Sequence, residues 1–292
     1  LILIVAFASC AGQSAPAGYA ELGEQALDYT RQVVELGPRP AGSEANRKQQ
    51  ELIVARLKET GCDVAEDAFT AHTPLGPRQM KNIVCEFGGT SGRVIAVTGH
   101  YDTLSRPGLD FVGANDGGSS TGLLLALAER LAGQERKDAV RLVFFDGEEA
   151  AVEWRDGDHT YGSGRMAEQW AADGTKEKLV GLINVDMIGD ADLELLYEGN
   201  STPWLRDLVV SVAHRLGYSA QFPRGQPMYI EDDHIPFLQR GMPAVDLIDF
   251  EYGLYNRYWH TENDTLDKLS PESFAVMLHV LDETIRELEK RP

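Results

Sequence analysis

The chain is poor in cysteine and in basic residues. Three cysteines among 292 residues are too few for a disulfide-stabilised scaffold, and their spacing does not match a structural zinc site. The 27 Lys and Arg residues are outnumbered by 46 Asp and Glu residues, which gives a formal net charge of −19 at pH 7. Because nucleic acids and anionic lipid surfaces are bound by clustered basic side chains, we expect no nucleic-acid partner.

The sequence also lacks an apolar run long enough to span a membrane. The N-terminus carries a shorter apolar run. The run LILIVAFASC is too short to span a bilayer and is typical of the apolar core of an export signal. We therefore assign residues 1–18 to an export signal and linker. Small residues around Cys10 resemble a bacterial lipoprotein signal, in which a lipid on Cys10 would be the only membrane anchor. Cleavage after Ala17 is the alternative, so we expect either a periplasmic or cell-surface lipoprotein or a secreted protein.

Residues 19–292 have the pattern of one α/β domain. Four short, continuous apolar runs, RVIAVTG, VRLVFFD, LVGLINVD and PAVDLID, are typical of strands buried on both faces. They alternate with helical patterns near residues 121–132, 204–216 and 271–290. This alternation predicts a doubly wound, mostly parallel central sheet flanked by helices. The pattern does not indicate an oligomeric state.

An antiparallel portion is expected near the start of this domain. Two strand-like runs, residues 63–71 and 81–87, are joined by a segment that contains Pro and Gly, which is typical of a hairpin. Cys62 and Cys85 flank or lie in these runs and could form a disulfide in an oxidising compartment. The sequence does not fix the alignment of the two strands, so their pairing stays open.

Side chains of the kinds that bind metals follow several of the buried strands. These residues are His100, Asp102, Asp116, Glu148, Glu149, Asp186 and His260. Ligands of open α/β sheets gather at the carboxyl ends of the strands, so we expect these groups to converge. Imidazole and carboxylate ligands together are typical of zinc, whereas calcium takes oxygen ligands only.

The adjacent pair Glu148 and Glu149 suggests a division of labour. Neighbouring residues after a strand point in different directions, so one carboxylate can bind a metal while the other stays free. A free carboxylate in a buried, negatively charged site has a raised pKa and can act as a general acid and base. An acidic helix start would also explain the pair, but it would not explain the other metal-binding residue types at comparable positions.

Several segments resemble a known family. GHYDT, GANDGGSSTG, FFDGEEA, NVDMIG and YWHTENDTLDKLSP are similar to motifs of the zinc aminopeptidase superfamily. Within it, the segment DDHIPFL at residues 232–238, together with Trp154 and Trp259, is most similar to the glutaminyl cyclases, or glutaminyl-peptide cyclotransferases. The resemblance implies a zinc aminopeptidase-like fold and covers nearly the whole chain from Tyr19, so residues 19–292 would form a single catalytic domain.

The resemblance also implies roles for individual residues. It implies one catalytic Zn²⁺ with three ligands: Asp116, Glu149 and His260. Glu148 would shuttle the proton, and Asp186 and Asp232 would support it through hydrogen bonds. His234, in the same motif as Asp232, fits a structural role better than a ligand.

Four residues are expected around the substrate. Trp154 and Trp259 would line an apolar pocket for the first residue of the substrate, although core packing explains Trp154 alone equally well. Glu231 stands where the animal enzymes have Gln, and Asp246 stands where they have His, so both would add negative charge near the substrate. A further pocket aromatic would come from the segment after Asp249, either Tyr252 or Tyr255.

The resemblance implies an enzyme that acts on peptide and protein N-termini. It would convert N-terminal Gln, and more slowly Glu, into pyroglutamate with release of ammonia. The alternative is an aminopeptidase with two zinc ions, in which His100 and Asp186 join the ligands and Asp116 bridges the metals. A catalytically inert binding protein would not need the complete set of ligand residues or Glu148.

Overall fold

A six-stranded sheet forms the centre of the computed structural model, which describes residues 14–292. The strand order is β1-β2-β4-β3-β5-β6. The bounds are β1 (Asp63–Thr73), β2 (Gly76–Phe87), β3 (Val94–His100), β4 (Ala139–Phe145), β5 (Leu179–Asp186) and β6 (Ala244–Ile248). Strand β2 is antiparallel to both of its neighbours, whereas β4, β3, β5 and β6 are parallel. The mostly parallel sheet with an antiparallel portion at its start is confirmed.

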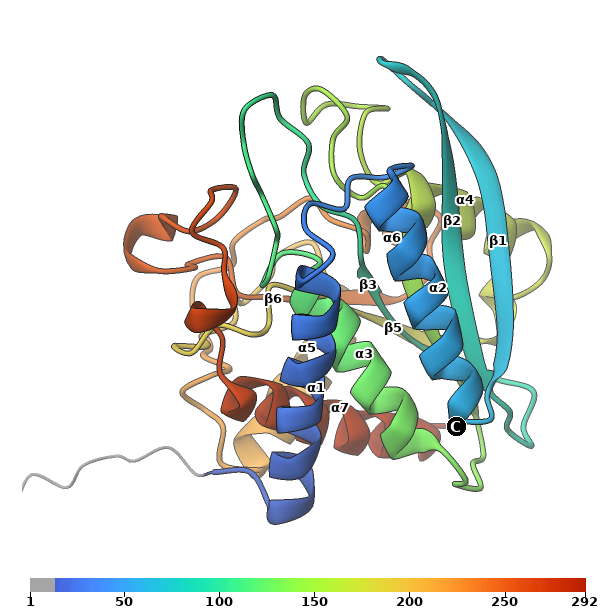
Figure 1. Ribbon diagram of the computed structural model, residues 1–292. Coiled ribbons are helices and arrows are strands. Elements are labelled where there is room, and N and C mark those ends of the chain that lie inside the picture. Colours follow the sequence, from blue (N-terminus) through green and yellow to red (C-terminus); the bar gives the residue numbers. More distant parts are fainter. Residues whose placement is uncertain (1–13) are drawn as a thin grey trace, which may run out of the picture.

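Helices cover both faces of the sheet (Figure 1). The larger layer consists of α1 (Ala17–Val34), α2 (Glu44–Glu59), α3 (Gly118–Leu131), α5 (Pro203–Arg215) and α7 (Pro271–Glu289). The other face carries α4 (Tyr161–Ala172) and α6 (Ile235–Gln239). Along β3, Ile95 and Val97 pack into the first layer, while Val94 and Ala96 pack into the second. Because successive side chains point to opposite faces, a strand covered on both sides needs an unbroken apolar run.

The start of helix α2 follows from local chemistry. The hydroxyl oxygen of Ser43 accepts a hydrogen bond from the backbone N–H of Asn46 (3.0 Å), so Ser43 is the N-cap of this helix. Helix α1 begins at Ala17, so the expected linker of residues 1–18 overlaps the first turn of the helix. The expected export signal before residue 14 lies outside the described residues.

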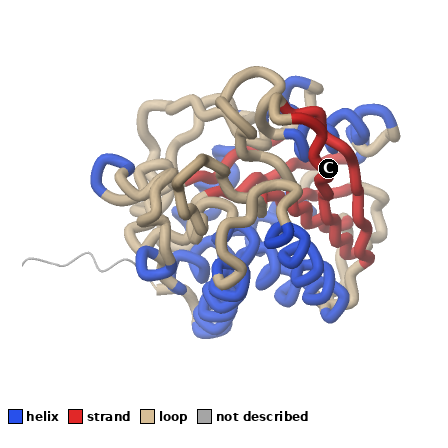
Figure 2. The backbone as a smooth tube through the Cα atoms, turned by 45° about the horizontal axis from the view of Figure 1, so that its top comes forward, coloured by secondary structure: helices blue, strands red, loops and turns tan. Residues whose placement is uncertain are grey.

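Loops gather at one side of the molecule, where the parallel strands end (Figure 2). They include the short turns η2 (Leu254–Asn256) and η3 (Leu266–Lys268), whereas the turn η1 (Lys176–Lys178) leads directly into the start of β5. Within residues 14–292, none of the helices has the length and apolar character needed to cross a membrane.

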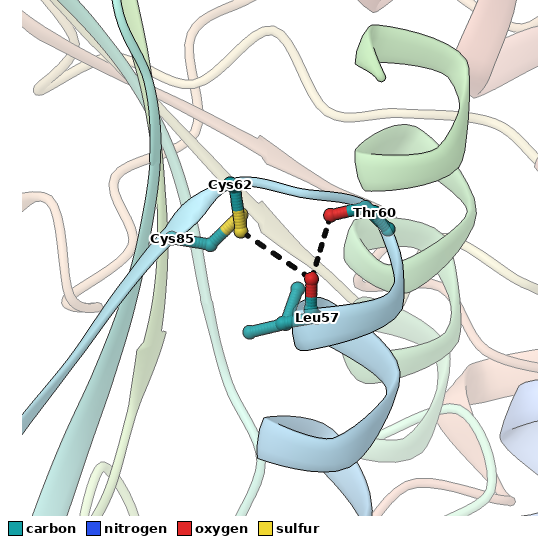
Figure 3. Close-up of a disulfide and its surroundings, with 4 residues drawn as sticks. All are labelled: Leu57, Thr60, Cys62 and Cys85. Atoms are coloured by element: carbon teal, nitrogen blue, oxygen red, sulfur yellow. Dashed lines mark hydrogen bonds between the residues drawn. A yellow bond between two sulfur atoms is a disulfide. The ribbon is translucent and has the colours of Figure 1, made fainter. Parts of the chain in front are cut away.

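A disulfide joins Cys62 to Cys85 at the end of α2 (Figure 3). The register of the hairpin pairs Val64 with Cys85. Cys62, two residues before Val64, therefore lies near Cys85, and the Cα atoms of the two cysteines are 5.6 Å apart. Nearby, the hydroxyl of Thr60 donates to the carbonyl oxygen of Leu57 (2.7 Å) and ends the helix. Strand register therefore settles the pairing that the sequence left open.

We expect the double substitution Cys62→Ser and Cys85→Ser to lower the free energy of unfolding by about 2–4 kcal/mol, because the bridge restricts the unfolded chain. Urea unfolding followed by tryptophan fluorescence measures the difference. A reductant should destabilise the wild type to a similar extent and leave the double variant unchanged. A wild type that is insensitive to reductant would contradict the prediction.

Candidate functional site

The polar residues at the strand ends surround a cavity of about 330 Å³. It lies where β3, β4, β5 and β6 end, as the parallel topology predicts. The lining residues are Asp116, Glu148, Glu149, Trp154, Asp186, Tyr229, Ile230, Glu231, Asp232, Ile248, Phe250, Trp259 and His260. We call this space the active-site cavity.

Asp116, Glu149 and His260 form a group that is spaced to hold one metal ion. Nε2 of His260 lies 3.2 Å from Oδ2 of Asp116 and 3.3 Å from Oε1 of Glu149. Both of these carboxylate oxygens are buried and accept no hydrogen bond from the described residues. Buried oxygens without a partner are costly, and a cation between them removes that cost. One imidazole and two carboxylates, with a position open to the cavity, suit a catalytic zinc ion.

A second group shares Asp116 with the first. Nε2 of His100 lies 3.2 Å from Oδ1 of Asp116 and 3.2 Å from Oδ1 of Asp186. Nε2 of His100 and Oδ1 of Asp186 are hydrogen-bonded, so this pair does not need a second metal ion as a partner. The same three residues are also close enough to one another to bind one.

Glu148 lies beside these groups and belongs to neither of them. Its side chain is nearly enclosed, with 6% of the residue exposed. Burial, and then the charges of Glu149 and Asp232, raise its pKa well above the usual range, against an opposing effect from His100. Burial is also the main reason that the pKa of Asp186 rises to about 7. A buried carboxyl group with a raised pKa, such as Glu148, is suited to taking up and releasing a proton.

Asp232 lines the cavity, whereas Asp246 lies behind it. The side-chain amide of Asn184 donates to Oδ2 of Asp232 (3.0 Å) and to Oδ1 of Asp246 (3.1 Å). Asp246, which was expected around the substrate, is buried and does not contribute to the cavity wall. Strand β6 points this side chain under the cavity, toward Asn184 of the neighbouring strand β5.

His234 lies in the same buried layer. Its Nδ1 is 3.8 Å from Oδ2 of Asp246, and its Nε2 is 3.5 Å from Oε2 of Glu198. The ring is fully buried and lies outside the cavity lining. His234 therefore has a structural setting, as the sequence indicated, although Asp232, His234 and Asp246 are also near enough to one another to hold an ion.

Aromatic rings form one wall of the cavity. The ring of Trp259 stacks on that of His260 with 4.0 Å between the centroids. Phe250 packs against Trp259 at 4.9 Å. The expected candidates for this aromatic, Tyr252 and Tyr255, are both wrong. Tyr252 is buried and its hydroxyl donates to Asp264 (2.8 Å), whereas Tyr255 is 90% exposed.

Trp154 also lines the cavity, and it is partly exposed to solvent. Its ring stacks on His159 with 4.0 Å between the centroids, and its Nε1 donates to Oε2 of Glu231 (3.2 Å). With 38% of its surface exposed, Trp154 is not a core residue. The alternative of ordinary core packing is therefore excluded for this side chain.

Two carboxylates that hold the backbone were not identified as such from the sequence. Asp102 was grouped with the possible metal ligands, but its carboxylate accepts hydrogen bonds from the backbone N–H groups of Glu148 (3.1 Å) and Glu149 (3.3 Å). Asp264 accepts from the backbone N–H groups of Asn115 (2.7 Å) and Asp116 (3.1 Å). An acidic residue in the segment HTENDT was the only signal for the second contact.

Comparison with known proteins places this geometry in a family. Residues 82–285 match peptidase family M28. The chain is 30% identical over 275 residues to the glutaminyl-peptide cyclotransferase of Drosophila melanogaster, an alignment that covers 84% of this chain and 76% of that protein. It is 33% identical over 291 residues to the glutaminyl-peptide cyclotransferase of Boiga irregularis, with 85% and 77% covered.

Solved structures agree with these relatives. The crystal structure of the glutaminyl cyclase from an Acidobacteriales bacterium matches with a TM-score of 0.88 and 36% identity, covering 99% of this chain and 100% of that one. The glutaminyl cyclase of Porphyromonas gingivalis matches with a TM-score of 0.81 and 26% identity, covering 91% and 98%. The chain therefore belongs to peptidase family M28 and, within it, to the glutaminyl-peptide cyclotransferases.

Proposed function

We propose that the protein is a zinc-dependent glutaminyl-peptide cyclotransferase that converts N-terminal Gln of peptides and proteins, and more slowly Glu, into pyroglutamate. The family assignment supports this activity over peptide hydrolysis. The observation that carries the proposal is the position of Glu148, a buried carboxyl group outside the metal-binding groups, in a cavity walled by Trp259 and Phe250.

Asp116, Glu149 and His260 would hold the zinc ion, because their ligand atoms converge and two of them are otherwise unpaired. When bound, zinc supplies Lewis-acid polarisation of the side-chain amide carbonyl of the substrate. Trp259 and Phe250 give the substrate side chain an apolar wall that excludes water.

The proton transfers are assigned to Glu148. The α-amine nitrogen of the substrate attacks the side-chain amide carbon, and Glu148 accepts a proton from that nitrogen as the new C–N bond forms. Glu148 then donates the proton to the departing amide nitrogen, and ammonia leaves as the old C–N bond breaks. No proton is gained or lost overall, so one carboxyl group with a raised pKa serves both steps. Asp232 contributes through its charge, which helps to raise that pKa.

We expect Glu148→Gln to lower kcat for a Gln peptide by at least about 10²-fold, the usual scale for a lost general acid and base. The substitution preserves size and removes the proton acceptor. Zinc should remain bound, because Glu148 is not in the three-ligand group. Mass spectrometry of a synthetic Gln peptide, which loses ammonia on cyclisation, measures the rate, and elemental analysis measures the zinc.

A peptide of the same sequence that starts with Leu is the control for the reaction type. The wild type should leave it intact. Release of free Leu would show aminopeptidase activity and reject the proposed function. Wild-type turnover by a zinc-loaded Glu148→Gln variant would remove Glu148 from the mechanism.

We further propose one zinc ion per chain. The hydrogen bond between Nε2 of His100 and Oδ1 of Asp186 (3.2 Å) supports this number, because it gives the second group a partner without metal, whereas Oδ2 of Asp116 and Oε1 of Glu149 in the first group have no hydrogen-bond partner. Elemental analysis of the purified protein should give about one zinc, lost in His260→Ala and retained in His100→Asn. Two zinc ions, with one lost in His100→Asn, would instead fit the two-zinc aminopeptidase arrangement.

We also propose that the protein is exported. The apolar N-terminal run supports this location, and so does the Cys62–Cys85 disulfide, a bond typical of oxidising compartments. Mass spectrometry of the mature N-terminus from the native cells tests it. A chain that starts with lipid-modified Cys10 would indicate a lipoprotein, and one that starts near Gly18 would indicate secretion. Retention of the whole apolar run would contradict export by either route.

A further inference from the structure

The mouth of the active-site cavity carries a negative charge that the proposed chemistry does not use. Glu231 lines this cavity and also a neighbouring cavity of about 450 Å³. Six carboxylates line the active-site cavity, and Glu231 is the only exposed one. Glu231 therefore lies on the solvent side of the cavity, together with the exposed side chain of Tyr229.

Little in the surroundings neutralises this charge. Among the described residues that line the active-site cavity, none is Lys or Arg. Arg240 and His159 are the basic residues of the neighbouring cavity. Nη1 of Arg240 donates to the carbonyl oxygen of Pro236 (3.1 Å), and burial lowers the pKa of His159, which favours its neutral form. The hydrogen bond from Trp154 Nε1 orients the Glu231 carboxylate without cancelling its charge. The site thus favours a cation.

An exposed aromatic ring stands close to this carboxylate in the sequence and lines the same cavity. Tyr229 is 70% exposed. Its ring lies over Gly199, where an added Cβ would come within 2.7 Å of Cε1 of the ring, so a larger residue there would displace it. The backbone N–H of Ile230 donates to Oε1 of buried Glu198 (3.2 Å), which fixes the segment between Tyr229 and Glu231.

We propose that Glu231, together with Tyr229 and Trp154, selects peptides in which Lys or Arg directly follows the N-terminal Gln. This inference rests on the proposed function. With the Gln side chain in the cavity, the second residue of the peptide lies at the mouth. A guanidinium or ammonium group there pairs with the carboxylate and packs on the aromatic faces. The overall charge of −19 also draws cationic peptides to the protein.

The test compares kcat/KM for three peptides that differ only at the second position: Arg, Ala or Glu. In the wild type we expect Arg to exceed Ala by about three- to tenfold, the scale of an exposed ion pair with a cation–π contact, and Glu to fall below Ala. In Glu231→Gln the Arg-to-Ala ratio should fall toward one. A ratio is used because any loss common to all peptides cancels.

Glu153→Gln is the matched control. Glu153 is exposed and adjacent to Trp154, and it lines neither cavity. The Glu153→Gln substitution removes the same charge from the protein as Glu231→Gln, and it should keep the wild-type Arg-to-Ala ratio of kcat/KM. The wild-type preference for Arg should also weaken as salt is raised, because exposed charges are screened.

Three results would overturn the inference: an Arg-to-Ala ratio near one in the wild type, an unchanged ratio in Glu231→Gln, or an equal decrease in Glu231→Gln and Glu153→Gln. The last would assign the preference to overall charge. Failure of the wild type to form pyroglutamate from any Gln peptide would instead reject the proposed function itself.

Discussion

Two buried aspartates, Asp102 and Asp264, each accept hydrogen bonds from two consecutive backbone N–H groups, and the geometry of the site depends on them. The first fixes the turn at residues 148–149, and the second fixes the turn at residues 115–116. Moving either turn would leave a buried carboxylate without its partners, which is strongly unfavourable. The hydroxyl of Tyr252 also donates to Asp264, so the loop that follows β6 is held by the same carboxylate. The metal-binding side chains are therefore positioned by the protein before any ion arrives.

The concentration of negative charge at the strand ends links metal binding to proton transfer. Neighbouring carboxylates in a buried site cannot all be ionised at low cost. Part of the charge is met by backbone donors and part by the imidazoles of His100 and His260. What remains raises the pKa of Glu148 and leaves oxygens of Asp116 and Glu149 without a hydrogen-bond partner. One electrostatic feature thus accounts for both the cation site and the raised pKa of the carboxyl group beside it.

The sequence allowed the sheet and most of the cavity floor to be predicted, because both follow simple rules. Buried parallel strands are continuous apolar runs, and their carboxyl ends meet at one edge. The support behind the floor follows no such rule. The contacts of Asp264 and Asp246 join segments far apart in the chain, and Phe250 lies in an irregular loop without a period. The Cys62–Cys85 bond could not be predicted, because it depends on the register between β1 and β2, and the pattern of polar and apolar residues in the two strands does not fix that register.

The floor and the mouth of the cavity are built from different parts of the chain. Strand ends and their aspartate anchors hold the floor, whereas Trp154 and residues 229–231 at the mouth come from two short loops. Each loop has its own support: Asp158 accepts from three backbone N–H groups of the first, and Glu198 accepts from the second. Substitutions at the mouth therefore need not disturb the metal-binding residues. In evolutionary terms, such an enzyme can change which peptides it prefers through a few loop mutations while its reaction stays the same.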